Sequence, residues 1–160
     1  MTEISVTPVT VEIRSQVLGL RVLPDQECFV GRMPELLVAA ESDPLSTPMA
    51  ILAGNEVVGY YRLDETPGAV AERDFGPSTI GVRGFFIDEN HQGQGYSTAA
   101  LTALLDDLRQ HNPKIHRVVL TINLSNDLAR SLYERAGFRA EPDAYLGGPA
   151  GPQAVMLRDL

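Results

Sequence analysis

Residues 92–98, Gln-Gly-Gln-Gly-Tyr-Ser-Thr, form a polar, glycine-containing segment between an apolar run that ends at Ile87 and a helical pattern that begins near Gly95. Glycines at such a position let backbone N–H groups turn inward, and the start of a helix adds about half a positive charge. Together these features can bind a pyrophosphate without any lysine. Between Arg83 and Arg109 there is no lysine or arginine, so an anion here would depend on backbone donors. A plain strand-to-helix turn explains the glycines at least as well.

A second segment that could do chemistry runs from Asn126 to Phe138. Asn126 is a good helix cap, and Gly137 is a good helix end. Tyr133 lies seven residues after Asn126, two turns along the same side of the predicted helix. Its apolar stripe is Leu128, Leu132 and Ala136. A phenol with a pKa near 10 can donate a proton at neutral pH. A capped amphipathic helix with a half-buried tyrosine accounts for the pattern without any chemistry.

The elements that hold these segments alternate between strand and helix patterns. The first half of the chain predicts a strand at 4–8, helices at 11–20 and 24–40, and a hairpin of 49–52 and 57–63 around Gly54-Asn55. Residues 64–77 predict an exposed connection. The second half predicts strands at 79–87 and 117–122, helices at 95–110 and 127–136, and late strands at 138–145 and 153–157. Gly84 inside a strand predicts a bulge or a close backbone approach. This order predicts an α/β domain with a mixed sheet and helices on its faces.

Composition places the chain, residues 1–160, in the class of single globular domains. No apolar run approaches the length of a membrane span, and residues 1–10 do not resemble a secretory signal, so we expect a cytoplasmic protein without a membrane partner. Cys28 is the single cysteine, which excludes an internal disulfide and favours a buried thiol. The net charge of -8 disfavours nucleic acid and favours a cationic partner, although mild acidity also serves solubility alone.

The two polar segments, in this order, resemble two linked motifs of the GNAT N-acetyltransferases. Residues 92–97 are similar to the family's (Gln/Arg)-x-x-Gly-x-(Gly/Ala) loop, with Gln92 first, Gly95 fourth and Ser97 in place of the usual Gly or Ala. Residues 126–138 are similar to the next motif at every key position. The resemblance implies a mixed, mostly antiparallel central sheet with helices on both faces and a splayed pair of parallel central strands.

The resemblance also implies acetyl-CoA as co-substrate and a set of residues that bind it, with no metal. Phe85, Phe86 and Ile87 would pair their backbone with the pantetheine arm, and strand 117–123 would splay away to admit it. Asn126 would hydrogen-bond the same arm, and Tyr133 would be the general acid that protonates the leaving thiolate. The pyrophosphate would lie against Gln92, Gly93, Gln94, Gly95, Tyr96, Ser97 and Thr98. The general base is open: Asp88 or an acid of the N-terminal helices.

The acceptor follows from a narrower resemblance. Residues 85–101 are particularly similar to bacterial diamine and polyamine acetyltransferases, and so are residues 23–30 and 43–51. With the acidic charge this predicts a small polycationic amine. Gln153 departs from that group, which often carries an acid there, and Glu35, Glu41 and Asp43 fit solvated surface acids at least as well as ligands. Other amines (an aminoglycoside, an amino acid or a protein N-terminus) and a non-catalytic acyl-CoA-binding module remain alternatives. The resemblance also makes a homodimer plausible.

Overall fold

The structure is a computed structural model that describes residues 2–22 and 32–160. Three sequence predictions lie outside these residues, wholly or in part. They are the buried thiol of Cys28, the resemblance over 23–30 and the first part of the helix predicted at 24–40.

Within the described residues, strands from the whole chain join in one sheet. The strands are β1 (Ile4–Pro8), β2 (Ser46–Ala53), β3 (Glu56–Asp64), β4 (Thr79–Ile87), β5 (Arg117–Asn123), β6 (Arg139–Ala140) and β7 (Gln153–Asp159). They lie in the order β1-β2-β3-β4-β5-β7-β6, and every neighbouring pair is antiparallel except β4 and β5. The predicted mixed, mostly antiparallel sheet with one parallel central pair is therefore confirmed.

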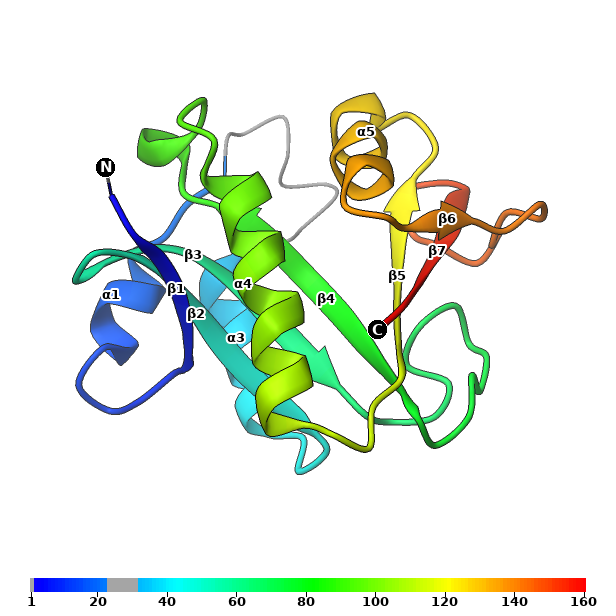
Figure 1. The fold of residues 1–160 in the computed structure, drawn as a ribbon, viewed down its shortest axis with the longest axis horizontal. Helices are drawn as coiled ribbons and strands as arrows, with labels where there is room; N and C mark the ends of the chain where they lie inside the picture. Colours follow the sequence, from blue (N-terminus) through cyan, green and yellow to red (C-terminus); the bar gives the residue numbers. More distant parts are fainter. Residues whose placement is uncertain (1, 23–31) are drawn as a thin grey trace.

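Helices cover both faces of this sheet, as predicted. They are α1 (Arg14–Leu18), α3 (Met33–Glu41), α4 (Tyr96–His111) and α5 (Asp127–Arg135), with a short 3-10 helix η2 (Glu89–His91). Figure 1 shows α4 crossing in front of the sheet, α3 behind it, and α5 above the end of β5. The apolar stripe predicted for α4 is fully buried: Leu101, Leu104, Leu105 and Leu108. Burial of each leucine stabilises this face by about 1.5–3 kcal/mol. On the other face Val17 and Leu37 pack with Tyr60 and Phe86.

The parallel pair β4–β5 separates toward its carboxyl end, and this separation creates the space for a site. The two strands pair only from Thr79 to Gly81 on β4, opposite Arg117 to Val119 on β5. Farther along, Gly84 adopts a left-handed φ of +64°, and the pairing of β4 with β3 shifts register beside it. The bulge predicted at Gly84 is thus present, because a residue without Cβ accommodates this backbone conformation. Figure 1 shows β4 and β5 diverging toward the end where α4 and α5 begin.

Two predicted elements are wrong in extent. The helix predicted at 11–20 shrinks to Arg14–Leu18, and Val11 is 90% exposed. Val11 is six residues before the buried Val17, which rotates it roughly 120° away from the helix face that meets the sheet. The strand predicted at 138–145 pairs with β7 only at Arg139–Ala140 and through one bridge at Tyr145. Pro142 interrupts it, since proline has no N–H for the ladder.

Candidate active site

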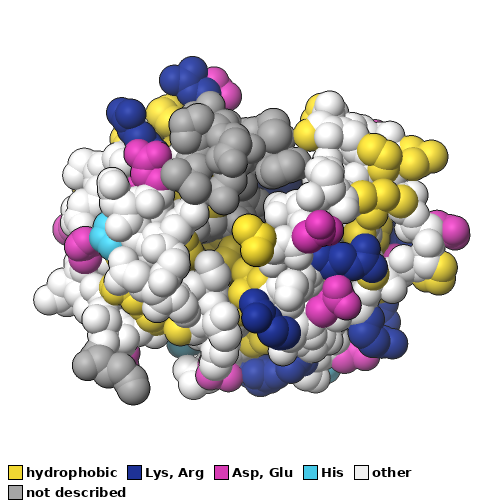
Figure 2. Space-filling model, turned by 90° about the horizontal axis from the view of Figure 1, so that it is seen from above, with side chains coloured by type: hydrophobic (Ala, Val, Ile, Leu, Met, Phe, Trp, Pro, Cys, Tyr) yellow, Lys and Arg dark blue, Asp and Glu magenta, His cyan; other side chains and the backbone are white. Residues whose placement is uncertain are grey.

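A cleft of about 540 Å³ opens above the carboxyl end of β4, between the first turn of α4 and helix α5. Every cofactor residue predicted from the sequence lines it except Gln94. The predicted residues that line it are Phe85, Phe86, Ile87, Gln92, Gly93, Gly95, Tyr96, Ser97, Thr98, Asn126 and Tyr133. Figure 2 looks down on this end of the molecule and shows apolar side chains around a hollow near the centre of the face. Segments far apart in the sequence thus converge on one cavity, here called the cofactor cleft.

The loop before α4 has a backbone geometry that suits an anion. Gly93 and Gly95 have φ angles of +79° and +78°, in the region that favours glycine, and Gly95 caps α4. The first N–H groups of a helix have no partner within the helix, so the 16-residue α4 points free donors and its positive end at the cleft. Gln92 Nε2 donates to the carbonyl oxygen of Ile87 at 3.0 Å, which ties this loop to the end of β4.

The carboxyl half of β4 offers its backbone on the side that faces β5. Pairing between the two strands stops at Gly81, so the edge at Phe85–Ile87 is not taken up by β5. An unpaired strand edge accepts an extended chain through main-chain hydrogen bonds. The amide-containing arm of a pantetheine is such a chain, and this geometry suits the role predicted for these residues.

Helix α5 positions Asn126 and Tyr133 between the diverging strands. Asn126 Oδ1 accepts a hydrogen bond from the backbone N–H of Ala129 at 3.2 Å, so its amide nitrogen is left to donate into the cleft. The side chain of Tyr133 is 6% exposed, and its ring packs on Phe85 and Phe138 with centroids 6.1 and 5.4 Å away. Burial raises the pKa of Tyr133 above its ordinary value, which keeps the phenol protonated at neutral pH.

Leu128 corrects one detail of the sequence prediction. It was expected on the buried stripe of α5, yet its side chain is 82% exposed. The first turn of α5 extends over the gap between β4 and β5, so Leu128 finds no core beneath it and lines the cofactor cleft instead. Arg135 and His91 also line this cleft, and neither was predicted. Arg135 offers an anion a full positive charge that the loop lacks.

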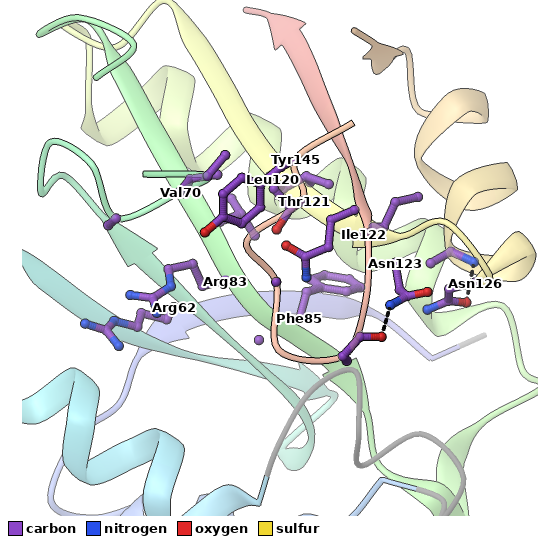
Figure 3. Close-up of a pocket in the computed structure, with 18 of the residues that line it drawn as sticks. Arg62, Val70, Arg83, Phe85, Leu120, Thr121, Ile122, Asn123, Asn126 and Tyr145 are labelled. Atoms are coloured by element: carbon purple, nitrogen blue, oxygen red, sulfur yellow. Dashed lines mark hydrogen bonds between the residues drawn. The ribbon is translucent and has the colours of Figure 1, made fainter. Parts of the chain in front are cut away.

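A second cavity of about 370 Å³, here called the acceptor pocket, lies on the side of the sheet covered by α3. Leu36 of α3 and Tyr60 of β3 contribute to its wall. Both cavities are lined by Phe85, Asn126, Ala129 and Tyr133. Figure 3 shows Asn126 and Asn123 at one end of the pocket and Arg62 and Arg83 at the other. The two cavities therefore meet at Tyr133, where a molecule from each side can approach the same point.

The charged wall of the acceptor pocket is fixed by a buried carboxylate. Arg62 and Arg83 are opposite each other in the β3–β4 pairing. Asp64, whose side chain is fully buried, lies 2.8 Å from Arg83 Nη1 and 3.5 Å from Arg62 Nη2. Burial alone would raise the pKa of Asp64, but hydrogen bonds from the Thr66 N–H and Arg83 lower it below its ordinary value. Asp64 thus stays ionised and holds both guanidinium groups in place.

The connection at 64–77 is not only an exposed linker, because Glu72 in it lines the acceptor pocket. Val70 anchors this connection through burial against Val119 and Val155. Glu72 has a left-handed φ of +53°, which is uncommon for a residue with a side chain. Burial and the hydrogen bond to the Glu72 carboxylate raise the pKa of Tyr145, which also lines the pocket. No local pattern in the sequence indicates this placement.

Two of the acids that the sequence offers as candidate bases, Asp88 and Glu41, lie outside both cavities. Asp88 is buried, and its carboxylate accepts from the Arg21 N–H at 2.8 Å, from the Asn90 N–H and from His91. Glu41 forms two 2.8 Å hydrogen bonds with Arg14 at the surface. Among the described residues, neither Asp88 nor Glu41 lines either cavity.

The described residues hold neither a candidate metal site nor a candidate membrane span. Across residues 2–22 and 32–160, no cluster of three His, Cys, Asp or Glu side chains is suited to a metal ion. In the same part of the chain, no helix is long and apolar enough to cross a bilayer.

Comparison with known families supplies the decisive observation. The sequence model of the "Acetyltransferase (GNAT) family" matches residues 16–138, which include both polar segments and the splayed strands. The chain belongs to the GNAT family of acetyltransferases. This confirms the resemblance found in the sequence, the predicted fold and an enzyme class in which acetyl-CoA is the acetyl donor.

Two curated relatives of this GNAT chain come from Bacillus subtilis (strain 168). A spermine/spermidine N(1)-acetyltransferase is 27% identical over 157 residues, which cover 98% of this chain and 99% of the relative. An uncharacterized N-acetyltransferase, YbbJ, is 24% identical over 132 residues and covers 82% of each chain.

Solved structures share the fold at lower identity. Aminoglycoside acetyltransferase AAC(6')-Ib in complex with coenzyme A has a TM-score of 0.75 and 19% identity, over 98% of this chain and 95% of that one. Spermidine N-acetyltransferase from Vibrio cholerae in complex with CoA and spermine has a TM-score of 0.72 and 15% identity, over 98% and 95%. At this identity the likeness shows the fold alone.

Proposed function

We propose that this GNAT chain transfers an acetyl group from acetyl-CoA to the primary amine of a small molecule, and that the transfer takes place beside Tyr133. The observation that carries the proposal is the meeting of the cofactor cleft and the acceptor pocket at Phe85, Asn126, Ala129 and Tyr133. Direct transfer requires donor and acceptor to reach one point from opposite sides, held close and in line.

The described residues fit acetyl-CoA as the occupant of the cofactor cleft. The first turn of α4 and the Gly93–Gly95 loop receive the pyrophosphate, and the β4 edge at Phe85–Ile87 pairs with the pantetheine arm. Asn126 donates its amide N–H groups to the same arm, and Leu128 covers it. Acetyl-CoA supplies the activated thioester whose C–S bond breaks as the new C–N bond forms.

Tyr133 holds the proton that the departing sulfur needs. A thiol ordinarily has a pKa near 8.5, well below that of a phenol, so complete proton transfer from Tyr133 in the resting protein is unfavourable. Because burial raises the Tyr133 pKa further, this residue acts first as a hydrogen-bond donor to the charge that develops on sulfur. Transfer of this proton to the sulfur would by itself leave a phenolate, which the order of the two pKa values disfavours, so it is completed only as a proton lost by the acceptor ammonium returns to Tyr133. The products are then the amide and a thiol, and Tyr133 is again a phenol.

The class of the acceptor amine is the finer point. The full-length relative named for spermine and spermidine and the net charge of -8 support a polyamine or diamine, the class predicted from the sequence. The described wall of the acceptor pocket does not share that acidity. Its charged residues are Arg62, Arg83 and Glu72. Figure 2 likewise shows acidic and basic side chains interspersed among the described residues of the face seen from above.

A CoA-thiol release assay over a panel of amines, combined with calorimetry of acetyl-CoA, tests this function. We expect saturable acetyl-CoA binding and turnover of at least one primary amine. If neither acetyl-CoA nor CoA binds at millimolar concentration, the proposal is wrong. If acetyl-CoA binds and no diamine, polyamine, aminoglycoside, amino acid or peptide is acetylated, the chain is an acyl-CoA-binding module. The homodimer and the cytoplasmic location stay predictions from the sequence.

A further inference from the structure

Arg83 lies at the acceptor pocket, and most of the N–H donors of its guanidinium group have no hydrogen-bond partner among the described residues. Its side chain is 42% exposed, and its one described polar contact joins Nη1 to Asp64 Oδ2 at 2.8 Å. Within the described residues, Nε and Nη2 have no hydrogen-bond partner. An arginine presents up to five donors in a planar fork, which matches the two oxygens of a carboxylate.

Arg62, beside it, plays a different part. Its Nε donates to Ser46 Oγ at 2.8 Å, and its Nη2 donates to Asp43 at 3.1 Å and lies 3.5 Å from Asp64. Its side chain is only 12% exposed. The donors of Arg62 are therefore used by the protein itself. Because Asp64 is shared between Arg62 and Arg83, its single negative charge does not fully neutralise Arg83. Of the two arginines, Arg83 is the one presented to an occupant.

Another donor in the same wall lacks an acceptor. The hydroxyl of Tyr60 is buried and, within the described residues, has no hydrogen-bond partner. Tyr60 lies two residues before Arg62 on the same face of β3. Burial raises the pKa of Tyr60 to about 12, although the positive charges of Arg62 and Arg83 lower it in part. A buried polar group without a partner is costly. Tyr61 has a hydroxyl in the same state but lines neither cavity, so among the described residues Tyr60 is the one such donor in the wall of the acceptor pocket.

The position of Arg83 on β4 places it within reach of Phe85, the residue that packs against Tyr133. It precedes Phe85, which lines both cavities, by two residues. At the rise of a strand, their Cα atoms are no more than roughly 7 Å apart. Figure 3 shows Phe85 between Arg83 and Asn126. A small molecule can thus span from Arg83 to Tyr133.

We propose that the acceptor of this enzyme carries a carboxylate as well as its primary amine, and that Arg83 binds this carboxylate. This inference rests on the proposed function. The opposing acid, Glu72, already shares its carboxylate with Tyr145, whereas Arg83 faces the pocket with donors to spare. A second ammonium in place of the carboxylate would meet a like charge at Arg83.

Three amines with one five-carbon chain test the proposal: pentylamine, 5-aminopentanoate and 1,5-diaminopentane. They differ only in the second end group, which is neutral, anionic or cationic. We expect kcat/KM to be highest for 5-aminopentanoate and lowest for the diamine. A three-carbon set (propylamine, 3-aminopropanoate and 1,3-diaminopropane) repeats the comparison at a shorter reach.

The variant Arg83→Gln should lower the ratio of kcat/KM for 5-aminopentanoate to that for pentylamine by about 10- to 100-fold. Because both rates come from one preparation, loss of folded protein cancels in the ratio. Arg83→Lys, which keeps the charge and loses the fork, should restore part of it. Glu72→Gln is the matched control, since it removes the opposite charge from the same pocket and should not lower the ratio.

Several outcomes would overturn this inference while the acetyltransferase stands: equal rates for pentylamine and 5-aminopentanoate, a preference for the diamine, or an unchanged ratio in Arg83→Gln. If no amine in either set is acetylated, calorimetry of the same compounds on CoA-saturated protein decides. Tighter binding of 5-aminopentanoate than of pentylamine, lost in Arg83→Gln, supports the carboxylate site, and equal binding removes it. Failure of CoA itself to bind would remove the proposed function first.

Discussion

The cofactor cleft and the acceptor pocket share Tyr133, yet they are assembled from different kinds of chain segment. The cleft draws on two continuous stretches, residues 85–98 and helix α5 with its cap, and it offers mainly backbone groups and a helix end. The pocket collects side chains from β3, β4, β5, the connection at 64–77 and the loop at 148–153. Its charged residues are held by contacts between segments distant in the sequence, such as that from Asp64 to Arg83.

This difference has a consequence for specificity. Backbone donors at the N-terminus of α4 are present whatever the side chains, so a bound pyrophosphate constrains few positions beyond the glycines. The acceptor pocket recognises its occupant through side-chain charge, and a single substitution changes that. We therefore expect variants on the two sides to separate cleanly into effects on acetyl-CoA and effects on the amine, with Tyr133 affecting neither affinity.

The largest effect is expected at the point the two sides share. Tyr133→Phe removes the hydroxyl and leaves the ring to pack on Phe85 and Phe138. We expect kcat to fall by about 10²–10⁴-fold, because the leaving sulfur loses its proton donor. Steady-state kinetics with a saturating amine, together with calorimetry of acetyl-CoA, measure this.

Tyr61→Phe is the matched control for that variant. Tyr61 is also buried, also contacts Phe85 with ring centroids 6.2 Å apart, and lines neither described cavity. Its hydroxyl has no partner within the described residues, so its removal should cost little stability and leave kcat near the wild-type value. A Tyr133→Phe enzyme that turns over as fast as Tyr61→Phe would remove Tyr133 from the mechanism.

The next effect is confined to the acceptor side. Asp64→Asn removes the buried charge between Arg62 and Arg83 and should lower the free energy of unfolding by about 1.5–3 kcal/mol. Since the folded-state pKa of Asp64 is lowered, its stabilisation is present above the unfolded pKa, near 3.8, and is lost as the pH falls through the folded value. Urea unfolding at pH 7 and below pH 4 should show the difference between wild type and variant shrinking.

Asp64→Asn should also raise KM for the amine while the dissociation constant of acetyl-CoA stays as in the wild type. Asp64 lines neither of the two cavities, so the effect on the amine passes through the position of Arg83. Weaker acetyl-CoA binding by folded Asp64→Asn protein would mean that the cofactor cleft and the acceptor pocket are coupled and do not bind their ligands independently.

A smaller effect belongs to the cofactor side. Gly95→Asp places a negative side chain at the left-handed N-cap of α4, where the pyrophosphate is expected, and should weaken acetyl-CoA binding by about tenfold. Gly54→Asp is its control: φ is +61°, no atom lies within 4 Å of a built Cβ, as at Gly95, and the residue is in the β2–β3 turn. Both variants should lose similar stability, but only Gly95→Asp should lose affinity. Equal affinities in calorimetry would contradict the loop assignment.

The contrast between the two cavities also explains what the sequence could predict. Strand 79–87 and the capped helices follow from local patterns, because the spacing of apolar residues and caps decides them. The splayed parallel pair and the convergence of residues 85–98 with Asn126 were predicted only through the family that the two linked motifs resemble. Glu72 and Arg83 carry no local signal, since their role depends on which segments the sheet brings together. The prediction that Leu128 is buried was wrong for the same reason. Its spacing in the sequence is that of a core residue, but the splayed strands leave no core beneath it.

The smallest expected effect is at His91, which joins the cofactor side to the rest of the sheet. Its Nε2 lies 2.7 Å from Glu56 and its Nδ1 3.2 Å from Asp88. Partial burial lowers the pKa of His91, but the hydrogen bonds to the two carboxylates outweigh it and raise the pKa above 6.5. A raised folded-state pKa means that the stabilisation is fully present below pH 6.5 and disappears as the pH rises through the folded value.

His91→Gln should therefore be less stable than the wild type at pH 5.5, and this difference should become smaller by pH 8.5. Since Glu56 is 59% exposed, solvent screening limits the difference to about 0.5 kcal/mol. Urea unfolding at several pH values measures it. His116→Gln is the control, because His116 is exposed and its ring has no partner among the described residues. If the His91→Gln difference stays constant with pH or grows at alkaline pH, the charged pairs do not hold this corner of the cleft, and its position depends on Asp88 and the turn at 88–91 alone.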